Sequence, residues 1–204
     1  MSLFRKIEIS VALALVASII FSVFSFAKTS ENIRNDVLRL HVIANSDSPA
    51  DQNLKLAVRD EILSKGEELF NGSVNVKNAV EKISPYIDEL ESCAAEIIKM
   101  RGYDYPVKIT IDKEYFETRT YKTVTLPAGE YLSLIVRIGE SKGKNWWCVM
   151  FPPMCISAAD ENDVLKDVMN KNELKLVNSN PNFEPRFKII EIIENIKNIK
   201  NKYR

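Results

Sequence analysis

The chain has 204 residues, 46% of them hydrophobic, and its 28 basic side chains balance its 28 acidic ones. This length suits one domain with a full hydrophobic core, because two domains sharing it would each be small. With no net charge to attract phosphates, the composition argues against a nucleic-acid-binding protein.

Residues 7–27 form a nearly continuous apolar segment that follows Arg5 and Lys6. Its length is close to the roughly 20 residues that span a bilayer, and its last residues are small enough for a signal peptidase site, so cleavage and anchoring both stay open. The preceding basic residues predict that the rest of the chain is moved out of the cytoplasm. We expect residues 1–27 to be a signal peptide or membrane anchor and residues 28–36 to be a polar tether.

The first strand and helix of the domain are expected between residues 37 and 70. Residues 37–44 alternate in a way that predicts a strand with one apolar face in the core. Ser48 then has the form of a helix cap, with Pro49 at the first helical position. A second helical region is predicted over residues 76–99, and Pro85 is expected to interrupt it.

A period of two predicts strands in the middle of the chain. Residues 107–112 and 115–125 read as extended segments, and residues 131–138 and 145–151 fit a hairpin joined by the loop 139–144. Helical signals return towards the C-terminus, at residues 158–170 and 185–203. This order predicts a single α+β domain over residues 37–204, with a largely antiparallel sheet of four to five strands and helices packed on one face.

The segment 143–155, Gly-Lys-Asn-Trp-Trp-Cys-Val-Met-Phe-Pro-Pro-Met-Cys, holds both tryptophans of the chain. On a strand, Trp146 and Trp147 face opposite sides, so at most one of them enters the core directly. The other is either exposed as an anchor for a protein partner, beside Phe151 and the two prolines, or covered by a helix.

The same segment contains two of the three cysteines, Cys148 and Cys155. Export would bring them to a compartment in which disulfides persist, which makes them disulfide candidates. Their pairing stays open, because a bridge also needs suitable backbone geometry. Cys93 lies in a helical pattern and is expected to be a buried free thiol.

His41, Ser46 and Asp47 are the residue types that a hydrolase uses as base, nucleophile and orienting carboxylate. Catalysis is not expected, because His41 lies in the middle of a predicted strand and no glycine-rich elbow presents the serine. Asn45, Asp47 and Asp51 could hold a cation, but a turn followed by a helix cap explains the same residues. We therefore expect no catalytic residue, metal or cofactor, and keep an extracytoplasmic hydrolase using His41, Ser46 and Asp47 as the alternative.

Two segments of the sequence resemble the stage II sporulation protein R family. The first covers residues 38–60 and contains Leu-Arg-Leu-His-Val-Ile-Ala-Asn-Ser-Asp-Ser, followed by Asp-Gln and then by Val-Arg-Asp. The second is the segment 143–155, in which a double tryptophan and a cysteine precede Phe-Pro-Pro. The resemblance extends from about Val37 to about Cys155.

The resemblance implies a non-enzymatic signalling protein of endospore-forming bacteria. Such a protein is made in the forespore and exported across the forespore membrane to the intermembrane space, where it triggers a membrane-embedded aspartic protease. That protease matures the precursor of sigma factor E in the mother cell. Contact with the membrane would be made through the N-terminal segment, and no small-molecule substrate is implied. A membrane-anchored structural protein of the envelope is a further alternative.

We expect the surface that contacts the protease to lie at strand termini, where loops are displayed. Its candidate residues come from the two distinctive segments. They are His41, Asn45, Asp47, Asp51, Arg59, Asn145, Trp146, Trp147 and Phe151.

Overall fold

The computed structural model describes residues 2–121, 124–154, 165–166, 168–178 and 185–202. Its elements follow one another in an α+β order, as the sequence predicts. They are α1 (Leu3–Asn35), β1 (Leu38–Ile43), α2 (Pro49–Phe70), α3 (Val76–Ile83), α4 (Ile87–Met100), β2 (Val107–Phe116), β3 (Arg119–Tyr121), β4 (Val124–Leu126), β5 (Gly129–Ile138), β6 (Asn145–Phe151), α6 (Lys171–Val177) and α7 (Pro185–Lys202).

The main sheet has four strands in the order β2-β5-β1-β6, and β3 and β4 form a separate two-stranded ribbon. β1 is parallel to β5 and antiparallel to β6, while β2 is antiparallel to β5. The sheet is therefore mixed, with two antiparallel pairs and one parallel pair.

The predicted hairpin between residues 131–138 and 145–151 is wrong. Both strands exist, but β1 lies between them and pairs with each. The loop 139–144 consequently crosses the end of β1 and delivers β6 to its far side. Strand pairing between segments distant in sequence decides this arrangement, and periodicity does not contain that information.

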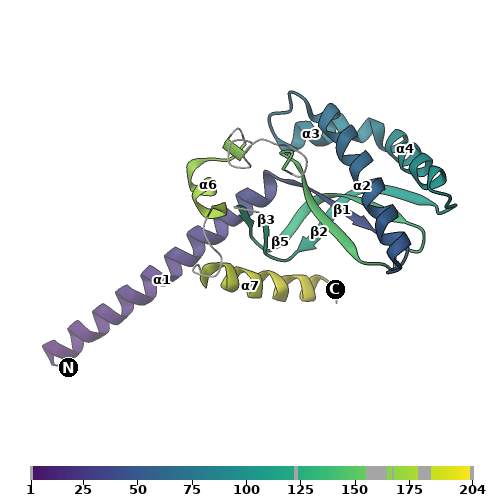
Figure 1. Ribbon diagram of the computed structural model, residues 1–204. Helices are drawn as coiled ribbons and strands as arrows, with labels where there is room; N and C mark the ends of the chain where they lie inside the picture. Colours follow the sequence, from purple (N-terminus) through teal and green to yellow (C-terminus); the bar gives the residue numbers. More distant parts are fainter. Residues whose placement is uncertain (1, 122–123, 155–164, 167, 179–184, 203–204) are drawn as a thin grey trace.

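One face of the sheet carries the first core, which includes Leu38, Leu40 and Val42 of β1, all with no exposed surface. Their alternation confirms the apolar strand face expected from residues 37–44. Helices α2, α3 and α4 lie together on this side of the sheet (Figure 1). Ser48 caps α2 by accepting a hydrogen bond from the Asp51 amide, and a short 3₁₀ turn at Ser84–Tyr86 separates α3 from α4, where Pro85 was expected to interrupt the helix.

The opposite face of the sheet carries a second core. Side chains from the end of α1, from α6 and α7 and from the β3–β4 ribbon meet the sheet there. Phe26 of α1 packs edge to face on Phe187 of α7, with 5.2 Å between the ring centroids. The sheet is thus covered on both faces.

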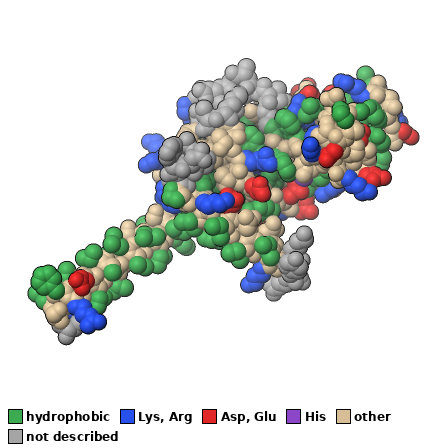
Figure 2. Space-filling model, turned by 60° about the horizontal axis from the view of Figure 1, so that its bottom comes forward, with side chains coloured by type: hydrophobic (Ala, Val, Ile, Leu, Met, Phe, Trp, Pro, Cys, Tyr) green, Lys and Arg blue, Asp and Glu red, His purple; other side chains and the backbone are tan. Residues whose placement is uncertain are grey.

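Helix α1 projects from the domain along most of its length (Figure 1). Among the described residues it is the one helix long and apolar enough to cross a membrane, by length and composition. Figure 2 shows hydrophobic side chains along the projecting part. Residues 28–35, expected to be a polar tether, instead continue α1, because Phe26, Ser30 and Ile33 are buried against the domain and hold the helix in place.

Candidate functional site

A hydrogen-bonded network, formed by Asn45, Ser46, Asp47 and Asp51, joins the end of β1 to the start of α2. We call it the β1–α2 network. The buried carboxylate of Asp51 accepts hydrogen bonds from the Asn45 Nδ2 at 2.9 Å and from the Ser46 Oγ at 2.5 Å. These donors stabilise the charged form, so they hold the pKa of Asp51 below its usual value.

The β1–α2 network also binds the loop that crosses β1. The Asn45 Oδ1 accepts a hydrogen bond from the Glu140 amide at 2.9 Å, and the Asp47 Oδ1 accepts one from the Lys144 amide at 2.6 Å. The side chain of Lys55 donates to the Lys144 carbonyl at 2.9 Å. The polar residues of the first distinctive segment therefore fix the position at which β6 begins.

Trp146 and Trp147 point to opposite faces of β6, as predicted. Trp146 is 37% exposed, and the Arg59 guanidinium of α2 lies 4.2 Å from the centre of its ring. Arg59 also donates two hydrogen bonds to the neighbouring Asp60. An exposed Trp with a stacked Arg combines two of the residue types that contribute most to protein interfaces.

Trp147 is half-buried on the other face, between His41 and Arg119. Its ring stacks on that of His41 with centroids 5.4 Å apart, and the Arg119 guanidinium lies 4.1 Å from its centre. The His41 Nδ1 lies 2.6 Å from a carboxylate oxygen of Glu114, and no described residue forms a hydrogen bond with its buried Nε2. Trp147 and His41 thus form part of the packing over the second face of the sheet.

The residues of the alternative hydrolase each have a different partner. His41 pairs with Glu114, Ser46 donates to Asp51, and Asp47 accepts from the Lys144 amide. A nucleophile and its base need to lie within hydrogen-bond reach of each other. The structure does not bring these three side chains together in that way.

Arg39 is a residue whose environment the sequence analysis missed. It has no exposed surface, and its guanidinium lies 4.3 Å from the Phe116 ring centre and 4.9 Å from that of Tyr131. It donates hydrogen bonds to the Cys148 carbonyl and to the Tyr121 hydroxyl, while its Nη1 has no hydrogen-bond partner in the part of the chain that the structure describes. Burial lowers the pKa of this guanidinium. The signal that could have found it is its position between Leu38 and Leu40, which directs it to the second face.

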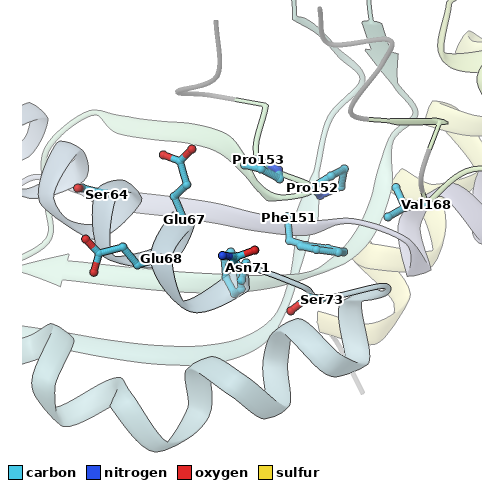
Figure 3. Close-up of a pocket in the computed structure, with 10 residues that line it drawn as sticks. Ser64, Glu67, Glu68, Asn71, Ser73, Phe151, Pro152, Pro153 and Val168 are labelled. Atoms are coloured by element: carbon cyan, nitrogen blue, oxygen red, sulfur yellow. The ribbon is translucent and has the colours of Figure 1, made fainter. Parts of the chain in front are cut away.

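A cavity of about 600 Å³ lies at the other end of β6, beside the C-terminal end of α2. Figure 3 shows Glu67 extending from α2 towards Pro152 and Pro153, which follow β6. The rings of Phe70 and Phe151 meet edge to face, with centroids 5.8 Å apart. The full lining is Ser64, Glu67, Glu68, Phe70, Asn71, Ser73, Phe151, Pro152, Pro153 and Val168.

The predicted contact residues therefore fall into two groups. Asn145 pairs with Ile43 and lies at the end of β1, near the β1–α2 network, whereas Phe151 pairs with Leu38 at the start of β1. At about 3.3 Å per residue, these two ends of β6 are about 20 Å apart. Cys155 lies outside the described residues, so its pairing with Cys148 stays a prediction.

Comparison with known proteins decides the family. A family model described as stage II sporulation protein R matches residues 34–161, well over half of the chain. Stage II sporulation protein R of Bacillus subtilis (strain 168) is 31% identical over 153 residues, which cover 73% of this chain and 68% of that protein. The chain belongs to the stage II sporulation protein R family. Its role is accordingly in sporulation. No solved structure matches.

In this member of the stage II sporulation protein R family, the residues that match the family model include every strand of the sheet and helices α2 to α4. The matched range therefore contains the β1–α2 network, both tryptophans and every lining residue of the cavity beside Phe151 except Val168. Helices α6 and α7 lie beyond its end. Within the described ranges, no group of three or more His, Cys, Asp and Glu side chains is placed to hold a metal ion.

Proposed function

We propose that this protein is an exported, non-enzymatic signal that activates a membrane-embedded aspartic protease, which then processes the sigma factor E precursor during endospore formation. The protein would pass from the forespore into the intermembrane space and act there. Family membership supports the sporulation role, and the length and apolar composition of α1 support export or anchoring.

The observation that carries the proposed contact is the exposed Trp146 with Arg59 stacked on it. The neighbouring β1–α2 network is satisfied internally, so it fixes the start of β6 without needing a ligand. A rigid aromatic and cationic pair loses little conformational freedom on binding, which favours affinity.

Activation requires that the protein bind the active form of the protease more tightly than the inactive form. A partner shifts a conformational equilibrium only through this difference in affinity. A tenfold preference for the active form corresponds to about 1.4 kcal/mol, so a few well-placed contacts are sufficient.

The proposal predicts that Trp146→Ala lowers activation strongly while His41→Gln does not. The test is co-expression of the exported chain with the protease and the sigma factor precursor in a host without sporulation genes, with cleavage followed by electrophoresis. Loss of an interface tryptophan costs about 2 kcal/mol or more of binding, which would lower cleavage about thirtyfold at limiting protein.

Two controls make the result interpretable. Tyr86→Ala removes another exposed aromatic side chain, 43% exposed, from the turn between α3 and α4 and should leave cleavage unchanged. Each variant should also be exported in the amount of the parent protein. Full cleavage with Trp146→Ala would contradict the proposed contact, and loss of all cleavage with a folded His41→Gln would favour the hydrolase.

A further inference from the structure

The lining of the cavity beside Phe151 carries two carboxylates. Glu67 and Glu68 both line it and are exposed, and neither forms an ion pair in the described part of the chain. No lysine or arginine is among its lining residues. Outside the lining, the Lys82 Nζ donates a hydrogen bond to the carbonyl of the lining residue Asn71 at 2.5 Å. Within the described residues, Glu67 and Glu68 are therefore the charged side chains of the lining.

The floor and one wall of the same cavity are apolar. Phe70 and Phe151 are 4% and 3% exposed and contact each other, while Pro152 and Pro153 form the side opposite α2 (Figure 3). The Ser73 Oγ is shielded from solvent and has no hydrogen-bond partner among the described residues. A volume of about 600 Å³ is within the ~300–1,000 Å³ range of ligand sites, and such sites combine apolar walls with a few polar groups.

We propose that this cavity binds a lysine or arginine side chain of the protease, together with the apolar residue next to it in the sequence. This inference rests on the proposed function, because it assigns a second docking point for the same partner. The aliphatic stem of the basic side chain would pack on Phe70, Phe151 and the prolines, and its charged end would reach Glu67. Glu68, at the rim and directed away from the prolines in Figure 3, adds to the attraction.

The position of the cavity supports a second docking point. It lies at the end of β6 opposite Trp146, about 17 Å away along the strand. Both points are attached to α2 and β6, so they are held at a fixed separation. Two linked contacts on one partner strengthen each other, because the second binds at a raised effective concentration.

The direct test measures binding of two short peptides to the full chain in detergent micelles, by changes in backbone amide resonances. The peptides are acetyl-Leu-Arg-Leu-amide and acetyl-Leu-Glu-Leu-amide. The arginine peptide should shift the resonances of residues 64–73 and 151, and the glutamate peptide should not.

Removing the two carboxylates with Glu67→Gln and Glu68→Gln should weaken binding of the arginine peptide about fivefold to tenfold, as expected for two partly exposed charge pairs. The matched control is Glu89→Gln with Glu96→Gln, which removes two exposed acids from α4. Equal binding of both peptides, absence of binding, or an unchanged affinity in the double Glu67 and Glu68 variant would overturn the inference.

A cleavage assay distinguishes failure of this inference from failure of the proposed function. Glu67→Lys with Glu68→Lys should lower precursor cleavage, whereas Glu89→Lys with Glu96→Lys should leave it unchanged. Full cleavage by the Glu67 and Glu68 charge-reversal variant would overturn the cavity as a docking point and leave the proposed function intact. If the parent chain itself gives no cleavage, the proposed function fails, and the peptide measurement still decides whether the cavity binds a basic side chain.

Discussion

Asp36 is the side chain from which we expect a measurable pH dependence. It follows α1, and burial together with the nearby Glu173 raises its pKa to about 6. A carboxyl group with a raised pKa in the folded state binds its proton more tightly there than in the unfolded chain. The stability that it contributes is therefore present at low pH and is lost as the pH rises from about 4 to about 6.

Asp36→Asn should remove this pH dependence and raise the free energy of unfolding at pH 7 by about 1 kcal/mol. The figure is discounted from the full shift because the carboxyl group is partly solvated. Urea unfolding at pH 4, 5, 6 and 7 measures it, with the exposed Asp104→Asn as the control. A parent protein that becomes more stable between pH 4 and 6 through this residue would contradict the assignment.

Arg39 shows the limit of sequence reasoning for a single residue. A lone arginine between two leucines normally predicts the solvent face of a strand. Here that face is covered by the second core, and three aromatic rings surround the guanidinium. The position between Leu38 and Leu40 indicates which face Arg39 is on, but the rings of Phe116, Tyr121 and Tyr131 that bury it are far away in sequence, so no local pattern indicates its burial.

The predicted and observed folds differ at the loop 139–144, which is predicted to close a hairpin but crosses the end of β1 in the structure. The apolar alternation of residues 37–44 and the Ser48–Pro49 signal identified β1 and the start of α2, because these depend on neighbouring residues. The position of β1 between β5 and β6 depends on pairing across the sheet. The sequence alone predicts a hairpin instead, because β5 and β6 follow each other in the chain. The sequence predicts a turn and a helix cap at the β1–α2 network, together with candidate contact residues, but it does not predict that these side chains bind the loop that crosses β1.

Gly143→Ala tests whether this loop holds the fold. A Cβ at Gly143 would collide with the Ser46 carbonyl oxygen, which is backbone and cannot rotate away. The loop would have to shift, and the Lys144 amide bond to Asp47 would weaken. We expect a loss of about 1–3 kcal/mol in the free energy of unfolding.

Chemical denaturation measures this loss, and Lys142→Ala in the same loop provides the control because its side chain is exposed. A Gly143→Ala protein as stable as the parent would show that the loop adapts. The crossing would then be held by strand pairing alone.

At the scale of the whole molecule, α1 is both an apolar projecting helix and part of the second core. Cleavage after Ala27 would remove Phe26, which is 3% exposed and packs on Phe187. Losing a buried phenylalanine costs about 3–5 kcal/mol when a cavity remains. A chain that begins at Lys28 should therefore unfold at lower urea concentration than one that begins at Ser22.

The comparison of these two truncated chains has an internal control. Phe26→Ala in the longer chain should lower its stability to nearly that of the shorter one, because the same contact is lost. Equal stability of the two truncated chains would show that Phe26 does not support the domain.

The central claim is that this protein activates the sporulation protease by binding to it and not by catalysing a reaction. Its most direct test reconstitutes the purified protease, the sigma factor precursor and this chain in proteoliposomes, with cleavage rates measured against the concentration of this chain. We predict a saturable rise in rate and an unchanged mass of the protease, as expected when binding shifts an equilibrium. A rate that persists after this chain is removed, with a protease of altered mass, would contradict the account.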